Sequence, residues 1–179
     1  MAKDRKIDLV ILGLLSHEDL TGYDIKKQID SAISFFWKGS FGSIYPALGE
    51  MEKGGLVKRR KSGNTGGREK IIYQITKTGM DTLKTWLNDE KATNDLKYET
   101  LLKMYFGGVE DRNVTIRNIE IFEKQVREDL KLLKFYKENL EKVLDQETHV
   151  HYYLTVLFGI ETYEAYLRWC KKAMKMILQ

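Results

Sequence analysis

The chain has 179 residues, of which 42% are apolar and 31% are charged, and this composition is typical of a soluble globular protein of one large or two small domains. A single cysteine, Cys170, excludes an intrachain disulfide, and the first apolar run is too short for a signal peptide or a membrane span. We therefore expect a cytoplasmic protein with no membrane partner. The net charge is +4, but residues 1–87 hold 15 Lys/Arg against 10 Asp/Glu, while residues 88–179 hold 15 against 16. This excess of positive charge suits a polyanionic partner for the first half of the chain.

The first half of the chain predicts four helices and one β-hairpin. The expected helices span about residues 7–15, 22–33, 43–53 and 76–87. Thr21 and Thr76 are placed to cap the second and the fourth helix, and Ser40 or Ser43 to cap the third. Residues 19–21 are expected to form a turn ahead of the second helix.

A charged hairpin follows the third helix. Strands are predicted at residues 57–61 and 70–75, on either side of a glycine-rich tip. Helix, charged hairpin and helix in this order are typical of a winged helix, in which a recognition helix enters the major groove and the wing lies on the phosphates. The sequence therefore predicts that residues 43–53 recognise duplex DNA.

The candidate DNA-binding residues come from the helices and from the wing. They are Tyr23, Ser40, Ser43 and Tyr45 on the helical side, and Lys58, Arg59, Arg60, Lys61, Arg68 and Lys70 on the hairpin. Serine and tyrosine hydroxyls can bond phosphates or base edges, and lysine and arginine neutralise phosphates. Alternatively, the hairpin is an ordinary solvated surface, the serines cap helices, and the tyrosines pack.

The second half of the chain predicts long amphipathic helices. Residues 89–97 are polar and form the expected linker, after which helices are predicted at about 98–106, 111–145 and 149–178. Apolar residues recur every seven positions in the first long helix, which is typical of a coiled-coil seam. We predict a homodimer, because one helical hairpin would expose a large apolar face. The expected interface residues are Ile119, Phe122, Val126, Leu133, Leu140, Leu157 and Leu167.

No set of catalytic, metal-binding or cofactor-binding residues is visible. Residues 63–67 lack the GK[ST] ending of a phosphate loop, and His149 and His151 lie two positions apart with no acidic or cysteine cluster to complete a metal site. The sequence therefore does not favour an enzyme. The aromatic residues Trp37, Trp86, Trp169, Tyr152 and Tyr153 are expected either to pack in the core or to line a pocket for a small aromatic effector.

Five ordered motifs in residues 9–80 carry a family resemblance. They are Ile11-Leu12-Gly13-Leu14-Leu15, Thr21-Gly22-Tyr23-Asp24-Ile25, Gly42-Ser43-Ile44-Tyr45-Pro46-Ala47-Leu48, Gly55-Leu56-Val57, and Tyr73-Gln74-Ile75-Thr76 with Gly79. This set resembles the PadR family of bacterial transcriptional regulators. The segment from Tyr98 onward resembles the longer C-terminal region of a subgroup related to a virulence activator. The resemblance implies a homodimer that binds a palindromic operator, usually as a repressor and sometimes tuned by a small molecule.

The expected fold is mostly α with a small β-hairpin. It comprises an N-terminal winged helix-turn-helix DNA-binding domain, residues 1–88, and a C-terminal helical dimerisation domain, residues 98–179. The leading hypothesis is a sequence-specific transcriptional regulator that binds double-stranded DNA. The alternative is a protein–protein adaptor that keeps the winged helix without specific DNA recognition.

Overall fold

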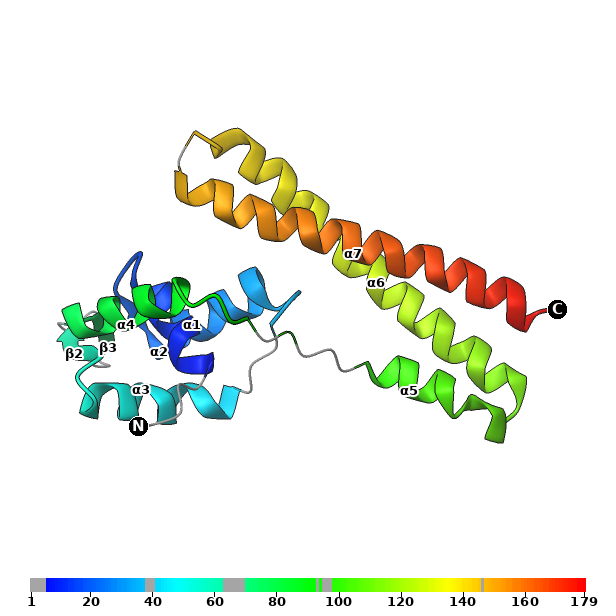
Figure 1. Ribbon diagram of the computed structural model, residues 1–179, viewed down its shortest axis with the longest axis horizontal. Helices are drawn as coiled ribbons and strands as arrows, with labels where there is room; N and C mark the ends of the chain where they lie inside the picture. Colours follow the sequence, from blue (N-terminus) through cyan, green and yellow to red (C-terminus); the bar gives the residue numbers. More distant parts are fainter. Residues whose placement is uncertain (1–5, 38–40, 63–69, 93, 95–97, 146) are drawn as a thin grey trace. The chain divides into compact units, whose positions relative to one another are not determined.

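The computed structural model describes residues 6–37, 41–62, 70–92, 94, 98–145 and 147–179 (Figure 1). The chain divides into two compact units, Met1–Thr93 and Asn94–Gln179. Two of the candidate DNA-binding residues, Ser40 and Arg68, lie outside the described residues.

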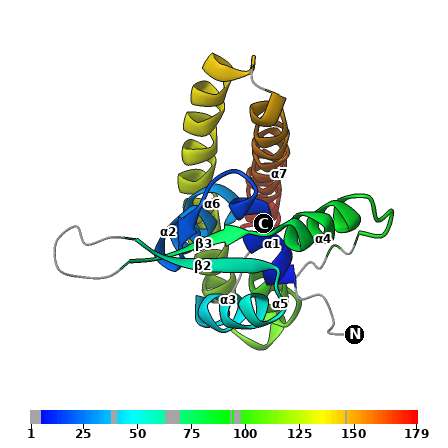
Figure 2. The ribbon, with the colours of Figure 1, turned by 90° about the vertical axis from the view of Figure 1, so that its left-hand side faces the viewer.

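The first unit is a winged helix. Its helices and strands are α1 (Lys6–Leu15), β1 (Leu20–Thr21), α2 (Gly22–Gln28), α3 (Ile44–Lys53), β2 (Val57–Ser62), β3 (Lys70–Ile75) and α4 (Lys77–Leu87). A π-helical turn, Ile29–Ile33, extends α2, and a 3-10 turn, Phe41–Ser43, precedes α3. Figure 2 shows β2 and β3 side by side as a hairpin, with α3 next to β2.

The sheet has one strand more than the sequence predicts. Its three antiparallel strands lie in the order β1-β3-β2, and Leu20 of β1 pairs with Tyr73. The sequence predicts only a turn at residues 19–21, because a two-residue strand is too short to show an alternating pattern. The hairpin itself runs in register from Val57 opposite Ile75 to Ser62 opposite Lys70.

The first unit is packed around one apolar core. Each helix contributes residues at helical spacing, such as Ile44, Ala47, Leu48 and Met51 on the inner face of α3. The core also takes in Val57 and Tyr73 from the hairpin, together with Ile7, Ile11, Leu12, Leu15, Leu20, Ile25, Ile29 and Leu83. The recognition-type helix and the wing are therefore anchored to the same body.

Capping residues join the parts of this unit. Thr21 forms a capping box with Asp24 at the start of α2, and Thr76 caps α4 through the Gly79 N–H. The Thr76 hydroxyl also donates to the carbonyl oxygens of Gly55 and Leu56, so that the turn after α3 is tied to α4. A Cβ at Gly79 would lie 2.2 Å from the Leu56 carbonyl oxygen, and only glycine permits this approach.

The second unit is a helical hairpin with a short helix at its start. It consists of α5 (Glu99–Tyr105), a 3-10 turn (Gly107–Val109), α6 (Arg112–Leu140), a 3-10 turn (Glu141–Val143) and α7 (Glu147–Ile177). Asp111 caps α6 through the Asn113 N–H. Figure 1 shows α6 and α7 packed along each other, and a tighter turn ends α6 before the predicted end near residue 145.

Three of the heptad residues of α6 are buried inside the helical unit itself. Ile119, Val126 and Leu133 are buried within a single chain. Gly159 of α7 lies against Leu133, since a Cβ at Gly159 would be 3.1 Å from both Leu133 methyl groups. An antiparallel hairpin places the apolar stripes of its two helices face to face, so α7 already covers these three side chains. They form the core of the hairpin, and their burial needs no second copy.

Candidate nucleic-acid interface

The outer face of α3 presents Tyr45. Its side chain is 61% exposed, although it lies in the first turn of a helix whose inner face is fully buried. The Tyr45 ring packs over the backbone of Gly22, because a Cβ at Gly22 would meet the ring carbon Cε1 at 2.6 Å. Tyr23, the next residue of α2, is 67% exposed. Two exposed phenol rings, those of Tyr23 and Tyr45, thus lie where the start of α3 packs on the start of α2.

Ser43 does not cap α3. It has helical backbone angles, and its side chain makes no capping hydrogen bond. The 3-10 turn Phe41–Ser43 leads directly into α3. The backbone is therefore already helical at Ser43, whereas a capping residue has an extended backbone. The side chain of Ser43 is half-buried next to Ile44.

The hairpin supplies the positive charge. Its described basic residues, Lys58, Arg59, Arg60, Lys61 and Lys70, are all exposed. Successive side chains of a strand point to opposite faces, so neighbouring residues of β2 lie on different sides of the sheet. Arg59 shares the face of the buried residues Val57 and Tyr73, and Arg60 lies on the other face.

Carboxylates of the same unit accompany both arginines. The Arg59 Nε lies 3.2 Å from the Glu52 Oε1 at the end of α3, and the Arg60 Nη2 lies 3.6 Å from the Asp19 Oδ2 ahead of β1. Sequence reasoning missed both acids. Their proximity depends on the pairing of strands that are far apart in the chain, and no local motif signals it.

Tyr73 joins the hairpin to this charged group. It is opposite Arg59 in the register and is buried. Burial raises the pKa of the Tyr73 hydroxyl, and the negative charge of Glu52 raises it further. Tyr73 is therefore a neutral, buried anchor beneath the exposed charges of the wing.

This arrangement can bind a polyanion. Exposed cations on a hairpin neutralise phosphates, and phenol hydroxyls at the start of a helix can bond phosphates or base edges. Within the described residues, no three His, Cys, Asp or Glu side chains come together as a metal site. None of the described helices has the length and apolar character needed to cross a membrane.

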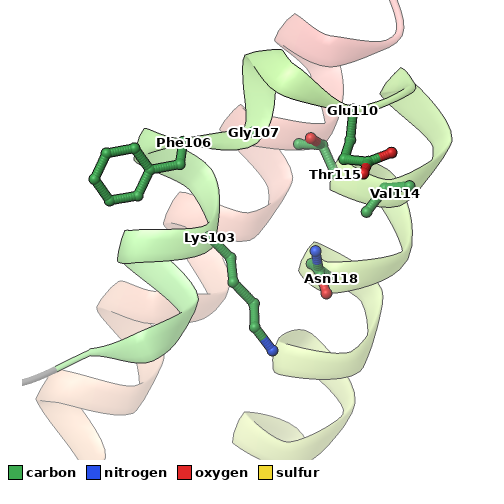
Figure 3. A pocket seen from close by; sticks show the side chains of 7 residues that line it. All are labelled: Lys103, Phe106, Gly107, Glu110, Val114, Thr115 and Asn118. Atoms are coloured by element: carbon green, nitrogen blue, oxygen red, sulfur yellow. The ribbon is translucent and has the colours of Figure 1, made fainter.

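The second unit contains two shallow cavities between α5 and α6. The first has a volume of about 310 Å³ and the second about 280 Å³, and both are lined by Lys103 and Asn118. Figure 3 shows the first cavity, with Lys103 extending along the gap between the helices and the Phe106 ring pointing away from it. Neither cavity is lined by any of the aromatic residues that the sequence offered for an effector pocket.

Comparison with known proteins identifies a family domain in each half of the chain. The model of the transcriptional regulator PadR-like family matches residues 11–85, and the model of the virulence activator alpha C-terminal region matches residues 96–177. The chain thus combines a domain of the PadR-like family with a virulence activator alpha C-terminal domain. It is a transcriptional regulator with a winged-helix fold, as its motifs predicted.

The PadR regulator of Bacillus subtilis is similar to this chain over nearly its full length. The negative transcriptional regulator PadR of strain 168 is 25% identical over 181 residues, which cover 97% of this chain and 98% of that protein. A crystal structure of B. subtilis PadR in complex with operator DNA has a TM-score of 0.82 at 26% identity and covers 97% of this chain and 99% of its own. A structure of B. subtilis PadR with p-coumaric acid has a TM-score of 0.74 at 24% identity and covers 98% of this chain and 100% of its own.

Proposed function

We propose that this PadR-like regulator is a cytoplasmic, non-enzymatic repressor that binds a palindromic operator as a homodimer. The observation that carries the proposal is the placement of an exposed basic hairpin beside α3, in a fold that B. subtilis PadR uses in its complex with operator DNA. Residues 1–88 would bind DNA, and residues 98–179 would hold two copies together. Each winged helix would then read one half-site.

The two parts of the DNA-binding surface have different roles. The wing residues Lys58, Arg59, Arg60, Lys61 and Lys70, with Arg68 beyond the described part, supply affinity for phosphates. Tyr45 at the start of α3 contacts the operator from the major groove, and Tyr23 contacts it from α2. Ser40 and Ser43 remain candidates for phosphate contacts.

The helical unit has the surface for a second copy. Among its described residues, α5 has no buried side chain, and Leu102 and Tyr105 are exposed on it. Phe122, Leu140, Leu157 and Leu167 are half-buried and stay in the proposed interface. Because α7 covers Ile119, Val126 and Leu133, the exposed apolar residues of α5, and not these three, would complete the dimer surface.

A small aromatic compound is the proposed effector. B. subtilis PadR has been crystallised with p-coumaric acid, and this chain aligns with that structure over nearly its whole length. An effector that favours a conformation with low affinity for the operator would release the DNA by shifting the population. Titration calorimetry with hydroxycinnamic acids tests this part separately from DNA binding.

Salt-dependent DNA binding tests the wing. The double substitution Arg59→Ala/Arg60→Ala should weaken binding to every duplex and reduce the salt slope by about 0.9 for each phosphate that is no longer neutralised. Fluorescence anisotropy measures both effects, with a duplex from the region upstream of the gene, searched for an inverted repeat, and with a scrambled duplex. The control Lys171→Ala/Lys172→Ala removes two exposed cations of α7 and should leave the slope unchanged. Wild-type protein that binds neither duplex would support the adaptor instead.

A further inference from the structure

Two acidic side chains hold the adjacent arginines of β2. Glu52 contacts Arg59 at 3.2 Å, and Asp19 contacts Arg60 at 3.6 Å. The two pairs are separate, because adjacent residues of a strand point to opposite faces of the sheet. The acids come from different segments, one from the last turn of α3 and one from the residues before β1. The rest of the unit thus contacts the wing at two independent points.

The exposure of the four side chains shows how DNA would meet them. The arginine side chains are 56% and 71% exposed, and their partners Glu52 and Asp19 are 37% and 34% exposed. The guanidinium groups are thus the more accessible members of both pairs, with the carboxylates behind them. A phosphate that approaches the wing reaches a cation whose charge is already partly neutralised. Exposed ion pairs are weak, so a phosphate can compete with the carboxylate.

We propose that Glu52 and Asp19 are affinity-setting residues, which weaken the hold of Arg59 and Arg60 on the DNA backbone. The inference rests on the proposed function, since it concerns the same wing. Each carboxylate shares an arginine with the phosphate, which must displace the carboxylate to gain the full charge of that arginine. The effect acts on phosphate contacts and therefore on every duplex, whatever its sequence. The acids keep the complex weak enough for the regulator to leave its operator.

Neutral variants test the inference in the full-length protein. Glu52→Gln should bind both the operator and a scrambled duplex about two- to fivefold more tightly, the change that corresponds to an exposed ion pair. Asp19→Asn should have the same direction and a smaller size, because its contact is longer. Glu18→Gln is the matched control. It removes one negative charge next to Asp19, but Glu18 accepts a hydrogen bond from Gln28 and holds no wing arginine among the described residues.

A double-mutant cycle separates the ion pair from a general charge effect. The gain from Glu52→Gln should disappear in an Arg59→Ala background if Glu52 acts through Arg59. Equal gains from Glu52→Gln and Glu18→Gln, a gain that survives in Arg59→Ala, or weaker binding by Glu52→Gln would each overturn the inference while leaving the proposed function intact. If the wild type binds no duplex at all, the proposed function fails and the inference falls with it. Thermal unfolding of each variant confirms that the fold is retained.

Discussion

The two units of this chain bury their apolar residues to different extents. Among the described residues, the first unit exposes six large apolar side chains, and the second exposes fourteen, although the two are similar in length. The first unit surrounds one core with four helices and a sheet. The second has two long helices and a short one, and a pair of helices covers only one stripe on each. The first unit is therefore complete in itself, whereas the second offers a surface to a partner.

The difference shows why a heptad pattern does not identify an interface by itself. Periodicity reveals that Ile119, Val126 and Leu133 are covered by another helix. It does not reveal whether that helix belongs to the same chain. In this fold the short connection after residue 140 brings α7 back onto α6, and the hairpin buries its own seam. The surface left for a second copy is then what remains outside the seam.

Truncating a buried side chain between α6 and α7 should have the largest effect, on the free energy of unfolding. Leu133→Ala deletes a side chain that is 1% exposed and packs on Gly159, so we expect it to destabilise the helical unit by about 2–5 kcal/mol. Urea unfolding followed by circular dichroism measures this. Phe135→Ala, two residues away and 56% exposed, is the control and should change the stability of one chain by less than about 0.5 kcal/mol. Similar costs for both variants would contradict the assignment of the seam to a single chain.

Changing the exposed residues of α5 should act on association instead. Leu102→Ser/Tyr105→Ser removes two exposed apolar side chains and leaves the hairpin core untouched. We expect the dimer to dissociate at least about tenfold more readily, as is usual when interface anchors are truncated. Sedimentation equilibrium across a concentration series measures the constant. A wild-type chain that is monomeric at micromolar concentration, or a variant that dimerises as tightly as the wild type, would exclude α5 from the interface.

Local chemistry explains which elements were predictable. The caps Thr21 and Thr76 and the two strands of the wing follow from residue types a few positions apart. Strand β1 was missed because two residues show no period. The cap at Ser43 was wrong because a 3-10 turn extends α3 backwards, and nothing in the composition of residues 41–43 distinguishes such a turn from a cap.

The candidate site was predictable in its residue types but not in its contacts. The basic run 58–61 and the tyrosine near the start of α3 are visible in the sequence, and the structure places them on the surface. The alternation of a strand predicts that Arg59 and Arg60 face opposite ways. Their partners Glu52 and Asp19 depend on tertiary contacts, and so does the close approach of Tyr45 to Gly22. These are the features that set the affinity of the surface and the orientation of its side chains.

A substitution at Tyr45 should have the smallest effect of those considered, and it tests one proposed DNA contact of the first unit. Tyr45→Phe removes one exposed hydroxyl and keeps the ring that packs over Gly22. Operator affinity should fall about two- to tenfold, the cost of one hydrogen bond, and the melting temperature should hardly change, because the ring still packs on the glycine. Anisotropy titration and calorimetry measure the two quantities, and Tyr23→Phe tests the neighbouring phenol in the same way. A melting temperature that falls together with the affinity would make Tyr45 a packing residue. The DNA contacts proposed for the helical side would then rest on Tyr23, Ser40 and Ser43, and the wing would supply the rest.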